Sequence, residues 1–208
     1  MANGEAFSIP HHDLVDRSID ALAADLAEGR MSARELTQAY IDRIEATNTS
    51  GPCLRAVNDI NPDALEIADQ LDAERRSGNM RGPLHGIPIL IKENIDTADG
   101  MPTTAGSLAL LDLTKPKTRA SRRSCAKPAC GDSRKTNLSE FANFRSTRSS
   151  SGWSGRGGQC VNPYQLDRSP SGSSSGTRAW RHRRRWRRAR WEPKPTDRSF
   201  RPPTRAAW

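Results

Sequence analysis

The chain has 208 residues, a hydrophobic fraction of 34% and a mean hydropathy of -0.78, so it can form one or two small domains but is poor in apolar residues for an enzyme of this length. Its net charge of +9 and pI of about 10.0 are typical of proteins that bind nucleic acid or an anionic membrane. No apolar run reaches the length of a transmembrane helix, and the N-terminus lacks the pattern of a signal peptide. We therefore expect a cytoplasmic protein with no membrane span.

The net positive charge of the chain comes from two stretches. Residues 178–208 carry a net charge of +10 and residues 115–134 a net charge of +6, which leaves −7 for the rest of the chain. The cysteines show no CxxC pair and no histidine spacing typical of zinc; they are Cys53, Cys125, Cys130 and Cys160. We expect free thiols in a reducing compartment, with no metal and no cofactor.

Apolar residues at helical spacing predict three helices, over residues 13–28, 32–47 and 62–78. Ser32 and Glu35 form the capping-box pattern that typically starts a helix. Short apolar segments between and after these helices predict strands over residues 54–60 and 87–91. Alternating helices and strands favour an α/β layered fold.

The strand over residues 87–91 ends in a lysine, Lys92. Burying an unpaired ammonium is costly, so a lysine in such a place tends to lose its proton, and the neutral amine is a base. The alternative is that Lys92 extends its ammonium to water, which is the more common behaviour of a lysine at a strand end. Spacing alone favours this second interpretation.

Four blocks of sequence, in this order, resemble the amidase signature family, whose members are serine hydrolases with a Ser-Ser-Lys triad. The blocks are Gly82 to Thr104, Ala105 to Ser107, Lys135 to Ala142, and Ser169 to Gly176. The resemblance implies the N-terminal portion of the amidase signature fold, a mixed sheet flanked by helices. It also implies a small-molecule amide substrate and hydrolysis of a carbon–nitrogen bond.

The resemblance assigns roles to single residues. Lys92 corresponds to the family's base, and Ser173 to the serine that carries protons between the base and the nucleophile. The family pattern Gly-Gly-Ser-Ser-Gly-Gly stands here with serines, Ser171 and Ser175, in place of two glycines. The nucleophile should follow Ser173 by about two dozen residues, but Ser199 stands there without the expected glycines, so the nucleophile serine is absent.

Two stretches depart from the family, residues 115–134 and residues 178–208. Neither has a helical or strand period, and we expect both to be unstructured. Codons for residues 130–134 can be chosen so that a shifted reading frame gives Ala-Val-Ile-Leu-Gly, and codons for residues 191–200 so that it gives Gly-Thr-Glu-Thr-Asp-Gly-Ser-Phe. We therefore predict a truncated copy of an amidase gene that has changed reading frame at both places.

The predicted organisation is a flexible terminus over residues 1–12, a partial amidase domain over residues 13–177 with an aberrant segment at 115–134, and an Arg- and Trp-rich tail over residues 178–208. The resemblance implies an amidase-type hydrolase by lineage, and we predict that the chain is inactive because the nucleophile segment is missing. The alternative is a basic nucleic-acid-binding protein that acts through the tail, although we expect no specific nucleic-acid partner. The sequence carries no signal for an oligomeric state.

Overall fold

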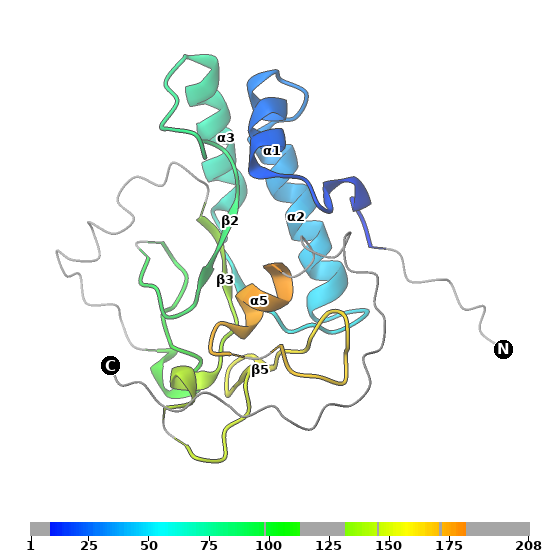
Figure 1. Cartoon of the computed structure of the whole chain (residues 1–208). Helices are drawn as coiled ribbons and strands as arrows, with labels where there is room; N and C mark the ends of the chain where they lie inside the picture. Colours follow the sequence, from blue (N-terminus) through cyan, green and yellow to red (C-terminus); the bar gives the residue numbers. More distant parts are fainter. Residues whose placement is uncertain (1–8, 98, 113–131, 145, 171, 182–208) are drawn as a thin grey trace, which may run out of the picture.

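Helices and a small mixed sheet build the fold in a computed structural model that describes residues 9–97, 99–112, 132–144, 146–170 and 172–181 (Figure 1). The helices are α1 (Ile19–Ala27), α2 (Ala33–Asn48), α3 (Ala64–Arg76) and α5 (Ser175–Arg181). The strands are β1 (Val57–Ile60), β2 (Ile89–Lys92), β3 (Asp132–Thr136), β4 (Trp153–Ser154) and β5 (Gly158–Gln159). Short 3-10 turns occur at His12–Leu14, Leu108–Leu110 and Glu140–Asn143.

The three N-terminal helices form where the apolar spacing predicts them, with one difference. At α2 the predicted capping box is confirmed: the Ser32 hydroxyl accepts from the Glu35 N–H at 3.0 Å, and the Glu35 carboxylate accepts from the Ser32 N–H at 2.8 Å. The first helix begins at Ile19, capped by Ser18, and not at residue 13. The reason is Asp16, whose φ of 68° lies in the left-handed region and interrupts the helix.

The core lies between these helices and the start of β2. Leu22, Leu26, Leu36, Ala68 and Ile87 are among its buried residues, each less than 4% exposed. The carboxylate of Asp72 in α3 accepts from the first two N–H groups of α2 at 2.8 and 3.1 Å. This contact fixes the two helices side by side and satisfies donors that a helix N-terminus otherwise leaves free.

The main sheet has the strand order β1-β3-β2, so β3 is its central strand. Strand β1 runs antiparallel to β3 and β2 runs parallel to it, which confirms the mixed α/β fold class. The expectation for residues 115–134 fails at its end, because residues 132–134 belong to β3. Backbone hydrogen bonds to both neighbours hold a strand whose side chains carry no strand pattern. Residues 115–131 of that stretch lie outside the described residues.

Helix α5 packs against β2, and Figure 1 shows it beside the sheet, apart from α1 and α3. It includes residues 178–181, the first four of the stretch expected to be unstructured; the rest of that stretch, 182–208, lies outside the described part of the chain, as do residues 1–8. Within the described ranges, no helix is both long and apolar enough to cross a membrane. Cys53 and Cys160 are free thiols, and burial raises the pKa of Cys160 to about 12.

Candidate active site

Lys92 lies at the C-terminal end of β2, where parallel strands of α/β folds commonly place functional groups. Its partner in the sheet is Thr136 of β3. The side chain is half-buried, and desolvation lowers the pKa of Lys92 below its ordinary value of 10.5. A lysine with a lowered pKa holds more neutral amine at neutral pH, and the neutral amine can accept a proton.

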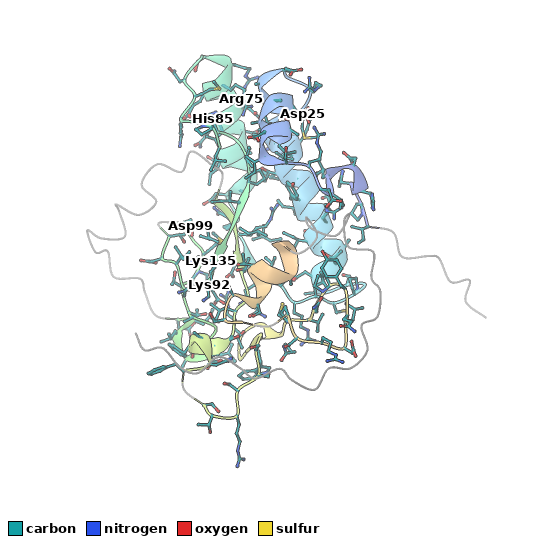
Figure 2. All side chains as sticks on the ribbon, in the orientation of Figure 1. Asp25, Arg75, His85, Lys92, Asp99 and Lys135 are labelled. Atoms are coloured by element: carbon teal, nitrogen blue, oxygen red, sulfur yellow. The ribbon has the colours of Figure 1, made fainter. Side chains whose placement is uncertain are left out.

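The face of the sheet that carries Lys92 is the one that α5 covers. Residues paired across a sheet share a face, so Lys92 lies on the same side as Thr136. The hydroxyl of Thr136 is 2.8 Å from the hydroxyl of Thr177 in α5. Figure 2 shows Lys92 and Lys135 at one end of the sheet and His85 and Arg75 at the other.

Ser173 comes two residues before α5 and is tied by its backbone to the continuation of β3. Its carbonyl oxygen accepts from the Ser139 N–H at 3.3 Å, and the Ser139 hydroxyl donates to the Gly172 carbonyl at 3.3 Å and accepts from the Gly152 N–H at 2.8 Å. Ser139 follows Thr136, the strand partner of Lys92, by three residues. The fold therefore carries Ser173 to the same end of the sheet as Lys92.

The backbone around Ser173 keeps the conformation that the glycine pattern allows, although serine replaces two of the glycines. Gly172 keeps a φ of 80°, which only glycine adopts without strain. At Gly176 a Cβ atom would lie 2.2 Å from the Ala56 carbonyl oxygen, so no side chain fits there. Ser175 replaces a glycine of the family pattern, but its backbone is helical and so needs no glycine. The replacement is unfavourable for another reason: the Ser175 hydroxyl is buried and has no hydrogen-bond partner. Ser171 lies outside the described residues.

A polar network beside Lys92 was not foreseen from the sequence. Glu93 is fully buried and accepts from Arg156 at 2.7 Å and from Asn58 at 2.5 Å, and it also accepts from the Thr104 hydroxyl. Arg156 donates to Asp59 at 2.8 Å as well. Burial opposes the charge of Arg156, but the hydrogen bonds to Asp59 and Glu93 outweigh it and raise the pKa of Arg156.

This network joins β1, the end of β2 and the loop between β4 and β5, so it holds the backbone that follows Lys92. Glu93 could have been found from the sequence, because an acidic residue directly after an apolar strand is a candidate for a site residue. Arg156 gave none, because it lies in a Gly- and Ser-rich stretch that is typical of a flexible linker.

Two further residues of the family block that begins at Lys135 hold the loops around the site. The Lys135 ammonium donates to the Thr103 hydroxyl at 2.6 Å and the Pro102 carbonyl at 3.2 Å, on the face of the sheet opposite Lys92. The Asn137 side-chain oxygen accepts from the Ser154 hydroxyl at 2.8 Å. Both side chains are fully buried and hydrogen-bonded, so they hold the surrounding loops in place.

Ser199, near which the nucleophile was expected, lies outside the described residues. Among the described residues, no group of three or more His, Cys, Asp or Glu side chains is placed to hold a metal ion. The fold carries Lys92, whose pKa is lowered, and the loop that bears Ser173 to the same end of the sheet.

Known proteins match the part of the chain that holds this arrangement. The family model named Amidase matches residues 35–180. A protein of Arthroderma benhamiae named as an amidase is 42% identical over 165 residues, and one of Schizosaccharomyces pombe is 40% identical over 164 residues. A crystal structure of a peptide amidase bound to the competitive inhibitor chymostatin is 49% identical with a TM-score of 0.72, and covers 79% of this chain.

The matches cover only part of the length of each relative. The two sequence relatives are each matched over 79% of this chain but only 27% and 28% of their own length, and the peptide amidase over 33% of its length. The chain thus spans about a third or less of the proteins that it resembles. Because the family model matches well over half of the chain, we conclude that the chain belongs to the amidase family.

Proposed function

We propose that this chain provides the base and the proton-carrying serine of a Ser-Ser-Lys amide hydrolase, and that it lacks the nucleophile. The observation that carries the proposal is Lys92, a half-buried lysine with a lowered pKa at the end of a parallel strand, on the face covered by the helix that follows Ser173. Membership of the amidase family supports the same roles.

The reaction follows from these groups. The neutral amine of Lys92 takes the proton of Ser173, and Ser173 takes the proton of the nucleophilic serine as its oxygen attacks the amide carbon. Backbone N–H groups stabilise the charge on the carbonyl oxygen. The proton returns by the same route to the leaving amine, and water then hydrolyses the acyl-enzyme. Solved relatives include peptide amidases, which makes peptide amides the first substrates to test.

As it stands the chain should show no amidase activity above background. Loss of one member of a catalytic triad typically lowers the rate by roughly a thousandfold or more. We attribute the loss to two changes of reading frame, in residues 115–134 and after residue 177. Sequencing the gene tests this origin directly: the proposal requires a shifted open frame at both places, and a single frame with no open alternative contradicts it.

The function itself is tested by repair. A protein with both stretches restored to the shifted frame, and extended by the remaining length of a relative, should hydrolyse amides with a rate that rises with pH through the lowered pKa of Lys92. Lys92→Arg should abolish this activity because arginine stays protonated, whereas Ser173→Ala should leave a residual rate because a water can replace the hydroxyl. Full activity of the repaired Lys92→Arg protein would show that the base is another group.

A second candidate rests on the tail. Residues 178–208 combine a net charge of +10 with Trp180, Trp186 and Trp191, a pattern that can contact phosphates and stack on bases. Binding of single-stranded nucleic acid that weakens with salt and disappears when residues 182–208 are deleted would favour this function. Retention of binding in the shortened chain, which keeps α5, would exclude residues 182–208 as its cause.

A further inference from the structure

A cavity of about 500 Å³ lies on the sheet face that α5 covers. Its walls are mostly apolar and come from α1, α2, β2, α5 and the turn near residue 165; they include Leu14, Leu22, Leu54, Leu90, Leu166 and Ala179. Neither Lys92 nor Ser173 lines it. Its volume falls within the range of roughly 300 to 1,000 Å³ that is typical of small-molecule sites.

One wall carries a buried cation. Arg134 of β3 lines the cavity and is 2% exposed. One terminal nitrogen of its guanidinium donates to the Thr37 carbonyl at 2.9 Å, but its Nε has no hydrogen-bond partner. In the part of the chain that the structure describes, no carboxylate forms an ion pair with Arg134.

The remaining charges around the cavity also favour an anion inside it. Arg43 lines the cavity, is 4% exposed and donates to the carbonyls of Pro10 and His11 at 2.8 and 3.0 Å. The acidic residue of the lining, Asp16, is exposed to solvent at the rim. Burial lowers the pKa of Arg134 to about 10, which still leaves its guanidinium charged at neutral pH.

We propose that this cavity binds an apolar carboxylate, with the carboxylate forming an ion pair with the guanidinium of Arg134 and the hydrocarbon filling the space between α1, α2 and β2. A buried guanidinium without a carboxylate partner is unfavourable, and a bound carboxylate supplies the opposite charge. The apolar walls take the rest of the ligand, since each methylene removed from water contributes to binding.

The test uses the full chain and decanoate as the probe, with titration calorimetry as the measurement. Decanoate should bind at least tenfold more tightly than decanol, which has the same chain without the charge. Octanoate, two methylenes shorter, should bind roughly tenfold more weakly than decanoate. Arg134→Gln should remove the preference for decanoate over decanol, while Arg168→Gln, at an exposed arginine, should leave it unchanged.

A second variant keeps Arg134 and fills the space. Ala179→Phe, at a buried position of α5 in the cavity wall, should abolish binding of both decanoate and decanol while circular dichroism shows a folded chain. The proposal is wrong if decanoate and decanol bind equally, if neither binds, or if decanoate binds the folded Ala179→Phe protein unchanged.

Discussion

The helical layer, which consists of α1, α2 and α3 with the loop packed on α3, differs from the region of β3 and α5 in how its buried polar atoms are hydrogen-bonded. In the helical layer the buried carboxylate of Asp25 accepts from Arg30 at 2.8 Å, and the His85 ring donates to the Leu71 carbonyl at 2.8 Å while accepting from the Arg81 N–H at 3.2 Å. Among the described residues, the buried side-chain atoms without a partner are Arg134 Nε and Ser175 Oγ, one in β3 and one at the start of α5. Misfitting residues are thus concentrated where the sequence departs from its family.

The sharpest form of this comparison lies within β3 itself, where two buried cations are neighbours. Lys135→Met should lower the free energy of unfolding by about 3 kcal/mol, because the Thr103 hydroxyl and the Pro102 carbonyl lose their buried donor. Urea denaturation measures the change. A loss below about 0.5 kcal/mol would mean that the Lys135 contacts do not stabilise the sheet.

Arg134→Met should act in the opposite direction. The substitution removes a buried charge with an orphan nitrogen and loses one hydrogen bond, to Thr37, so the free energy of unfolding should rise by about 2 kcal/mol. The same denaturation experiment in ligand-free buffer compares the two variants directly. Destabilisation by Arg134→Met would show that the buried guanidinium stabilises the fold, and that β3 does not differ from the helices in this respect.

Much of the helical layer is predictable from the sequence because its signals are local. The capping box at Ser32 and the apolar spacing of α2 are short-range patterns that the structure confirms. The start of α1 is not predictable in this way, since the left-handed Asp16 carries no sequence mark. Strand β3 could not be recognised either, because it is held by pairing with two strands distant in sequence and not by its own pattern.

The residues of the candidate site also fall into those that local sequence reveals and those that only the folded chain reveals. Lys92 ends an apolar strand and is visible from the sequence, and the resemblance supplied the role of Ser173. The contacts that hold the surrounding loops were not visible, because Glu93 and Arg156 are 63 residues apart and meet only in the folded chain. That Ser175 costs a hydrogen bond and not backbone strain also required the structure.

Two buried serines give a smaller contrast. Ser175→Ala should raise the free energy of unfolding by about 1 kcal/mol, since it removes a hydroxyl that has no partner. Ser154→Ala should lower it by about 1 kcal/mol, because the Ser154 hydroxyl donates to Asn137 and accepts from the Gly157 N–H, both within 2.9 Å. Equal effects of the two substitutions in thermal unfolding would contradict the assignment of Ser175 as a misfit.

The smallest expected effect is on the pH dependence of stability. Because the pKa of Lys92 is lower in the folded chain than the ordinary 10.5, the unfolded chain binds more protons in the interval between the two values. This contribution therefore makes stability rise with pH across that interval. Lys92→Met should flatten the rise when unfolding is followed at a series of alkaline pH values, and an unchanged slope would assign it to another group.

The most direct test of the proposed role of Lys92 is the titration of its side chain by NMR, observed at Cε and assigned with Lys92→Arg. The account predicts a midpoint below 10.5 in the folded chain, which returns to the ordinary value when urea unfolds the protein. A midpoint at or above 10.5 in the folded chain would mean that Lys92 keeps its proton as any exposed lysine does, and that this fold does not prepare it as a base.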